Sequence, residues 1–289
     1  MRVRFLGTGG SQPIPLPTCE CRLCREARRD GPPAARCGSE LFLPEIEGLV
    51  DASEFAPWSL SKAGSGVGSL SYCFLTHWHA DHAGGLRVLG MRPADVGPDE
   101  TVAEAKARTA PTLVTTRAVY ERAQESVGVL GHYVDAGIVD LHLLDEAGPL
   151  GTDGWRVDAL PYPLDPGSGT DDATGFLFDD GDATLAVVAD DARAFPEASL
   201  PADLDAVVFE SGYPSERPDG GRRRDPEPGE GDLSHAEVLA RVRRVGPEVA
   251  FLTHVGHQCG WSHDELAELA LDAAHDGVRF AHDGLVVEV

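Results

Sequence analysis

The feature that most constrains this chain is the run Thr-His-Trp-His-Ala-Asp-His at residues 76–82. Of the 11 histidines in 289 residues, three fall here within six positions, together with one aspartate. Imidazole nitrogen suits zinc and related metals, and aspartate adds an oxygen ligand. A strand over residues 71–76 leads into this run, so His77 and His79 should point to the same side. Asp81 and His82 follow in the turn that begins a helix, and one short segment can thus supply two adjacent metal ions.

Strands and helices are expected to be mixed along the whole chain, with no internal repeat, which is typical of one layered α/β domain over residues 1–289. Strands are predicted over residues 2–6, 40–50, 71–76, 112–116, 139–143, 155–160, 174–178, 184–189, 205–210 and 248–253, with two short strands at the end. Helices are predicted from about residue 82 and over residues 117–127, 235–245 and 262–275. Ser234 followed by Glu237 is typical of a capping box at a helix start. Residues 213–233 are rich in glycine, proline and charge, which predicts an exposed loop.

The net charge of −24 bears on the salt concentration in which the protein is stable and on the partners that it can bind. Self-repulsion of this size is screened by molar salt, so we expect a halophilic protein from a salt-rich cytoplasm. A surface without a basic face argues against general nucleic-acid binding. No apolar run approaches the roughly 20 residues that cross a bilayer, and the N-terminus has no signal-peptide pattern. We therefore expect a cytoplasmic protein with no membrane partner.

Three cysteines, Cys19, Cys21 and Cys24, are crowded into six residues. This spacing is too tight for a disulfide framework in a chain without a secretion signal, and it favours metal binding. Thiolate-rich tetrahedral sites are usually structural zinc sites with no open position. The fourth ligand must come from elsewhere in the chain. His257 is the best candidate, and Cys259 is its rival.

The run at residues 76–82 resembles the signature motif of the metallo-β-lactamase superfamily, and the resemblance extends over most of the chain. It implies a four-layer αββα sandwich with metals at one edge. Three further residues match the superfamily pattern, each directly after a predicted strand. Asp51 would orient the metal ligands, Asp190 would bridge the metals, and His254 would be the last histidine ligand. With His77, His79, Asp81 and His82, these residues form the expected catalytic metal site.

The segment Gly-Thr-Gly-Gly at residues 7–10, the cysteine trio and the run Leu-Thr-His-Val-Gly-His-Gln at residues 252–258 look like the phosphoribosyl cyclic phosphate phosphodiesterase family. That resemblance implies a phosphodiesterase that hydrolyses a small cyclic phosphodiester, such as phosphoribosyl cyclic phosphate, through a metal-bound hydroxide. It also implies one or two Zn²⁺ or Mn²⁺ ions at the catalytic site and a structural Zn²⁺ on the cysteine trio and His257. Asp81 would hold the nucleophile, and His235, at a predicted helix start, would meet the substrate phosphate.

One departure from the superfamily pattern concerns the histidine expected between the signature motif and the bridging aspartate. The corresponding stretch, residues 158–166, contains no histidine. Asp165 could replace it, because a carboxylate oxygen also binds zinc and manganese. Alternatively the first metal has only His77, His79 and Asp190 as protein ligands, with water completing the set.

Several other functions stay open on the sequence alone. The same metals could serve a thioester or lactone hydrolase, or a nuclease like the tRNA 3′-processing enzymes, although no basic RNA-binding insertion is seen. A non-catalytic or single-metal relative that binds a small metabolite is a further alternative. The expected partner is a small anionic substrate, and a homodimer is left open.

Overall fold

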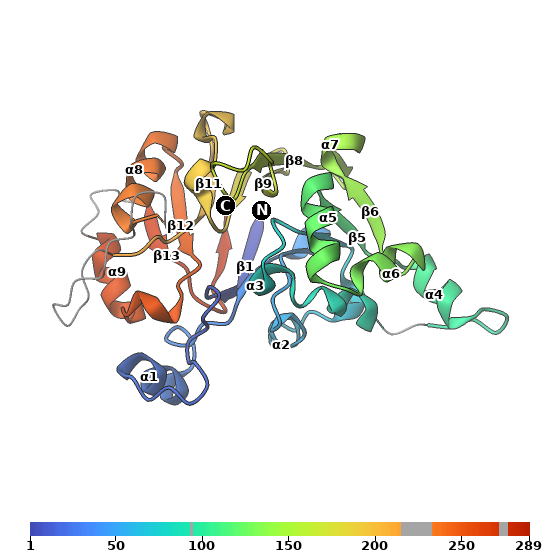
Figure 1. The fold of residues 1–289 in the computed structure, drawn as a ribbon, viewed down its shortest axis with the longest axis horizontal. Helices are drawn as coiled ribbons and strands as arrows, with labels where there is room; N and C mark the ends of the chain where they lie inside the picture. The colour runs from blue at the N-terminus through green and yellow to red at the C-terminus, as the bar shows by residue number, and fades with distance from the viewer. Residues whose placement is uncertain (93–94, 215–232, 272–276) are drawn as a thin grey trace.

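The computed structural model describes residues 1–92, 95–214, 233–271 and 277–289, and it contains two seven-stranded sheets (Figure 1). The first sheet has the order β14-β1-β2-β3-β4-β5-β6, and the second has the order β13-β12-β11-β10-β9-β8-β7. The strands of the first sheet are β1 (Arg2–Thr8), β2 (Ser39–Leu43), β3 (Gly48–Val50), β4 (Tyr72–Phe74), β5 (Thr112–Thr115), β6 (Asp140–Leu143) and β14 (Val286–Glu288). The strands of the second are β7 (Leu150–Thr152), β8 (Trp155–Tyr162), β9 (Ala173–Asp179), β10 (Thr184–Val188), β11 (Ala206–Glu210), β12 (Val249–Thr253) and β13 (Val278–Phe280).

Helices cover the outer face of each sheet. The helices are α1 (Arg22–Asp30), α2 (Ala56–Lys62), α3 (Ala80–Ala83), α4 (Val102–Arg108), α5 (Arg117–Ser126), α6 (Leu130–Asp135), α7 (Leu144–Ala147), α8 (His235–Val245) and α9 (His263–Leu271). Figure 1 shows α8 and α9 beside the second sheet and α5 and α6 beside the first. Helix, sheet, sheet and helix are stacked in that order, so the predicted four-layer αββα sandwich is confirmed. Among the described residues, no helix is both long enough and apolar enough to cross a membrane.

The layers are held together by three apolar cores, one between the sheets and one under each helical layer. Between the sheets, the Phe74 ring meets Phe178 at 5.0 Å and an interplanar angle of 85°, and the Phe5 ring meets Phe251 at 5.4 Å. An edge-on pair such as Phe74 and Phe178 adds to the stabilisation that burial of the rings provides. Both sheets are thereby fixed relative to each other, which matters because the candidate site takes residues from each.

Most predicted elements are present, and two details differ. The single strand expected over residues 40–50 is two strands, because a 3₁₀ turn at Pro44–Ile46 and the left-handed backbone of Glu47 interrupt it. The helix expected from about residue 82 is only α3, followed by a 3₁₀ segment at Leu86–Met91. The capping box of Ser234 and Glu237 is confirmed at the start of α8. Nearly all of the loop predicted over residues 213–233 lies outside the described residues.

The functional edge of the sandwich follows from strand direction. Strands β3 to β6 run parallel to one another, and so do strands β10 to β13. Ligands in sheets of this kind gather beyond the carboxyl ends of the parallel strands, where the loops leave the sheet. The predicted site residues lie in the segments that follow β3, β4, β10 and β12.

Candidate metal centre

Two groups of possible metal ligands lie at this edge, and each combines residues from both sheets. The first group is His77, His79 and Asp190, whose candidate ligand atoms all lie within 4.8 Å of one another. His77 Nε2 lies 3.1 Å from His79 Nδ1 and 3.6 Å from an oxygen of Asp190. Strand β4 ends at Phe74, so His77 and His79 lie in a loop and not on the strand end that the sequence suggested. Their rings nevertheless converge, because the loop turns toward Asp190.

The second group is Asp81, His82 and His254, again with ligand atoms within 4.8 Å of one another. His254 Nε2 lies 3.2 Å from Asp81 Oδ2, and His82 Nε2 lies 3.7 Å from the same oxygen. The His82 and His254 rings are stacked at 5.2 Å with an angle of 25° between their planes. Asp190 also reaches this group, because its Oδ1 lies 3.1 Å from His254 Nδ1 and its Oδ2 lies 3.6 Å from His82 Nε2. One carboxylate thus contacts both groups.

Asp51 fixes the orientation of His82 from behind. Its Oδ2 accepts a 2.7 Å hydrogen bond from His82 Nδ1, and its two oxygens also accept bonds from the amide and hydroxyl of Thr76. With the proton on Nδ1, the Nε2 atom of His82 carries a lone pair. That atom is buried and has no hydrogen-bond partner. A carboxylate behind a histidine is the usual way in which proteins set a metal-binding tautomer.

The donor set fits a divalent transition metal. Metal–ligand bonds of about 2.0–2.2 Å in tetrahedral geometry separate ligand atoms by roughly 3.3–3.6 Å. The separations of His82 Nε2 from Asp81 and from Asp190, 3.7 and 3.6 Å, are close to that range. Nitrogen and carboxylate ligands together suit zinc or manganese. The buried Nε2 of His82, which has no hydrogen-bond partner, fits such an ion.

The electrostatics of the site favour added positive charge near the carboxylates. Burial disfavours protonation of His254, but Asp190 and Asp81 outweigh it and raise its pKa to about 9. Burial also disfavours the charged form of Asp81, yet the hydrogen bond with His254 and the nearby histidines lower its pKa below the usual range. His77 has the opposite shift, because burial and the neighbouring histidines lower its pKa. His77 therefore stays neutral and able to donate a lone pair at neutral pH.

The backbone near this edge is held in uncommon conformations. Asp51 and His254 have positive φ values of 58° and 60°, in the left-handed region that few non-glycine residues adopt. The segment Gly-Thr-Gly-Gly at residues 7–10 ends β1 and continues beyond it, and its last residue, Gly10, packs on His254. A side chain at Gly10 would place its Cβ 2.9 Å from His254 Cε1, so only glycine fits there without movement. Gly10 is a residue of the site that the sequence motif pointed to without assigning it a contact.

The structure does not bring Asp165 into either group. Asp165 is exposed, and its carboxylate accepts a hydrogen bond from the Gly167 amide instead. At the end of β8 the side chain that reaches the site is Tyr162, which is buried and donates a 2.7 Å hydrogen bond to the backbone carbonyl of Asp190. Within the part of the chain that the structure describes, no replacement for the middle histidine joins the first group.

His235, expected to meet the substrate, is not part of either metal group. It is buried at the start of α8, and its Nδ1 donates a 2.9 Å hydrogen bond to the carbonyl of Ser211. The Ser211 amide donates to Thr253, the residue before His254. The ring stacks on Phe280, burial lowers its pKa, and its Nε2 is buried without a partner. This second unpartnered nitrogen leaves His235 available to a ligand.

Sequence reasoning missed Glu210, the last residue of β11. Its carboxylate accepts a 2.5 Å hydrogen bond from the Ala192 amide, and so holds the turn that follows Asp190. Burial, assisted by the charge of Asp190, raises its pKa to about 8. The signal was present in the sequence, because Glu210 ends a parallel strand between those that carry Asp190 and His254.

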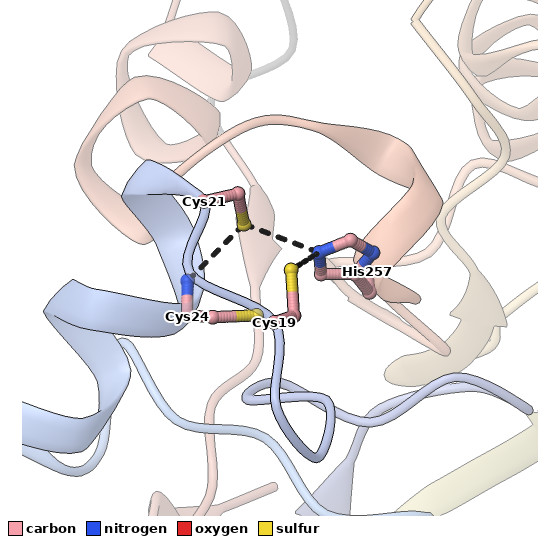
Figure 2. Close-up of side chains that lie close together, drawn as sticks. All are labelled: Cys19, Cys21, Cys24 and His257. Carbon is pink, nitrogen blue, oxygen red and sulfur yellow. Dashed lines mark hydrogen bonds between the residues drawn. The ribbon is translucent and has the colours of Figure 1, made fainter.

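The cysteine trio and His257 form a separate group (Figure 2). His257 Nε2 lies 3.2 Å from Cys21 Sγ and 3.5 Å from Cys19 Sγ, and Cys24 lies at the start of α1 beside them. Burial disfavours the Cys21 thiolate, but hydrogen bonds from the Cys24 amide and His257 outweigh it and lower the pKa of Cys21 to about 6. Three thiols and one imidazole suit a closed zinc site. Cys259, the rival of His257, is buried and is not part of this group.

Comparisons with known proteins agree with this geometry. The sequence model of a family described as "Beta-lactamase superfamily domain" matches residues 49–255. The fold is similar to a diphosphatase from the PhnP family, with a TM-score of 0.70 at 18% identity over 100% of this chain and 97% of that one. It is also similar to Zn²⁺-bound PqqB from Methylobacterium extorquens, with a TM-score of 0.70 at 20% identity over 100% of both chains.

One curated protein shares a local sequence similarity. An octanoyltransferase of Porphyromonas gingivalis is 38% identical over 91 residues, which are 30% of this chain and 17% of that protein. The similarity thus spans under a fifth of that relative's length.

Proposed function

This chain belongs to the metallo-β-lactamase superfamily of hydrolases, and from that premise we propose that it is a phosphodiesterase acting on a small cyclic phosphodiester. The observation that carries the proposal is the position of Asp190. Its carboxylate lies within 3.6 Å of His77 and His82 and 3.1 Å from His254. A carboxylate shared by two ligand groups is the arrangement that a pair of divalent ions requires, and paired ions suit the displacement at phosphorus.

Zn²⁺ or Mn²⁺ bound to these groups would act as a Lewis acid toward the phosphoryl oxygens and would make water acidic enough to serve as the nucleophile near neutral pH. His77, His79 and Asp190 would hold the first ion, and Asp81, His82, His254 and Asp190 would hold the second. Asp81 and Asp190 also provide oxygen acceptors that can orient the attacking water. Asp51 keeps His82 in the tautomer that presents Nε2.

His235 is assigned to the substrate. Its Nδ1 proton is committed to the Ser211 carbonyl, so Nε2 is the atom left for a ligand. With the proton on Nδ1, Nε2 carries a lone pair, so it would accept a hydrogen bond from a substrate hydroxyl or a proton from the attacking water. Because burial lowers the pKa of His235, Nε2 stays unprotonated at neutral pH, as a general base or a hydrogen-bond acceptor requires.

The cyclic phosphodiester is favoured over other substrates by the combination of motifs. The Gly-Thr-Gly-Gly loop, the cysteine trio and His257 together resemble the phosphoribosyl cyclic phosphate phosphodiesterases. A diphosphatase from the PhnP family has a similar fold. With a net charge of −24 and no basic face in its sequence pattern, the chain suits a small anion more than an extended nucleic acid.

The test is hydrolysis of phosphoribosyl 1,2-cyclic phosphate, 2′,3′-cyclic AMP, a thioester and a lactone by protein loaded with Mn²⁺ or Zn²⁺ in high salt. We expect turnover of cyclic phosphodiesters in preference to the carbonyl substrates. His77→Ala should remove it, while His132→Ala, an exposed histidine on α6, should not. Preferential hydrolysis of the thioester or lactone would reject the phosphodiesterase assignment and leave the hydrolase.

A second candidate is a relative with a single catalytic metal that binds a small metabolite. The absence of a fourth protein ligand in the first group, among the residues that the structure describes, favours it. Metal content per chain separates the two. Three ions per chain correspond to a catalytic pair plus the cysteine site, and two correspond to a single catalytic ion plus that site.

A further inference from the structure

A cavity of about 210 Å³ lies on the outer face of the first sheet, apart from both groups of metal ligands. It is enclosed by β1, by the end of α2 and by the turn that leads into β14. Leu6 and Ala63 contribute to its walls, and Trp58 and Val286 stand at its edge. Those two are among the few large apolar side chains left exposed, at 72% and 51%. An apolar cavity of about 150 Å³ already accommodates benzene, so this one can hold a ring with a short substituent.

Two cationic side chains line the same cavity. Lys62 is one of only two lysines in a chain of net charge −24, and it forms no ion pair with the residues that the structure describes. Arg4 donates through one terminal nitrogen to the Ala63 carbonyl, while its Nε is buried without a partner. In so acidic a protein, two cations facing an apolar space without a bound carboxylate are unusual.

The acidic groups around the cavity do not neutralise these cations. Asp283 is buried and accepts hydrogen bonds from the Thr8 amide, the Thr8 hydroxyl and the Cys37 amide. Its charge is balanced by Arg36, which lies behind it and shares Thr8. Glu40 accepts from Ser59, another lining residue, and burial raises its pKa to about 8, so it is largely neutral at pH 7. The remaining charge on the cavity is positive.

We propose that this cavity binds a small organic anion with an apolar body, of the size of an aryl carboxylate. The ring would lie against Trp58 and Val286, and the carboxylate would accept from Lys62, with the positive charge of Arg4 nearby. The floor of the cavity is connected to the metal edge. Cys37 lines the cavity, its carbonyl accepts from the Gly9 amide at 2.6 Å, and the adjacent Gly10 lies against His254.

The proposal is tested by titrating the metal-loaded protein with phenylacetate and following amide chemical shifts. We expect saturable shifts around Lys62 and Ala63. Lys62→Gln should weaken binding about tenfold, the size of one lost charge-assisted hydrogen bond. Lys106→Gln is the matched control, because the other lysine is bonded to the Gly90 carbonyl on a different part of the surface. The neutral analogue 2-phenylethanol should bind more weakly than phenylacetate.

Ala63→Leu provides an independent check, because the added side chain fills the cavity without changing its charge. It should abolish the shifts while the thermal melting temperature stays near that of the parent. Three results would overturn the proposal: no saturable binding, equal affinity of the Lys62→Gln and Lys106→Gln variants, or shifts confined to the residues around His77 and His254. The last result would mean that the carboxylate binds at the metal centre.

Discussion

The hydroxyl of Tyr162 donates a 2.7 Å hydrogen bond to the backbone carbonyl of Asp190. Tyr162 ends β8, and Asp190 follows β10, so the bond spans the strand β9 that lies between them. The tyrosine ring is buried and packs edge-on against Phe195 at 5.4 Å. The superfamily pattern places a histidine near the end of β8. In this chain Tyr162 lies there, and its hydroxyl holds the backbone of Asp190, whose carboxylate contacts both metal groups.

Tyr162→Phe should therefore weaken the site without removing a ligand. The ring still fills its space, but the Asp190 carbonyl loses a partner, at a cost of about 1 kcal/mol in the free energy of unfolding. Metal should be released at lower chelator concentration than from the parent. Tyr120→Phe is the control, because that hydroxyl accepts a hydrogen bond from Gln124 on the same helix and lies outside both metal groups. Identical metal retention in both variants would contradict the role of Tyr162.

Asp51→Asn should lower metal affinity more than it lowers stability. Asparagine tolerates the left-handed backbone at this position. A carboxamide has only one acceptor oxygen, so it cannot serve both Thr76 and the Nδ1 proton of His82. Losses of a carboxylate behind a metal-binding histidine typically reduce metal affinity by about 10–100-fold. Competition with a fluorescent chelator measures the change, and an unaltered affinity would show that Asp51 acts only in folding.

Gly10→Ala should displace His254, because the new Cβ would lie 2.9 Å from the imidazole. We expect loss of one catalytic ion and a fall in turnover of tenfold or more, with a small change in melting temperature. Gly151→Ala is the matched control, since no atom lies within 4 Å of a Cβ there. If Gly10→Ala keeps the metal content of the parent, the backbone at residue 10 moves to make room for the new Cβ and His254 stays in place.

Cys21→Ser should remove one zinc ion per chain and lower the melting temperature. The serine hydroxyl is not ionised at neutral pH, whereas the Cys21 thiol has a lowered pKa and is ready to bind as thiolate. Cys37→Ser changes a cysteine outside the group and should leave the zinc content unchanged. Elemental mass spectrometry on both variants decides the matter. Equal zinc content in Cys21→Ser and Cys37→Ser would show that the cysteine trio does not bind zinc.

Glu40 should make stability depend on pH. Burial raises its pKa from 4.5 to about 8 in the folded state. Between those values the folded protein keeps a proton that the unfolded chain has released, so the free energy of unfolding falls as pH rises, by at most about 1.36 kcal/mol per unit. Below pH 4.5 this contribution is constant.

Glu40→Gln removes this titration. The difference in melting temperature between the variant and the parent should therefore rise in favour of the variant from pH 5 to pH 8. Glu125→Gln, on the exposed face of α5, should run parallel to the parent. A constant difference between Glu40→Gln and the parent across this range would show that Glu40 is ionised in the folded protein.

The site residues that could be predicted are those whose position is fixed by local sequence. His77 to His82 lie together because they are consecutive, and Asp190 and His254 follow strands whose apolar runs are easily recognised. Residues that act through packing could not be assigned. Tyr162 looks like any buried aromatic residue until its hydroxyl is seen to reach Asp190. Asp165 satisfied the required chemistry, but the chain turns it outward.

The fold shows the same division. Alternating apolar residues predicted most of the strands, but the break between β2 and β3 depends on one 3₁₀ turn and on the left-handed Glu47. Short helices such as α2 and α6 are stabilised by the sheet beneath them and carry little periodicity of their own. Such elements are decided by tertiary contacts more than by local preference.

The turn after β12 carries both His254 and His257, and the backbone amides of Val255 and His257 donate to the carbonyls of Thr8 and Gln12. Ions at the two centres would therefore compete for, or share, one backbone arrangement. By thermodynamic reciprocity, any factor by which zinc on the cysteines alters metal affinity at His254 also applies to the effect of that centre on the zinc. A backbone arrangement that both ions favour would link the centres, so that loss of zinc from the cysteines would also weaken metal binding at His254.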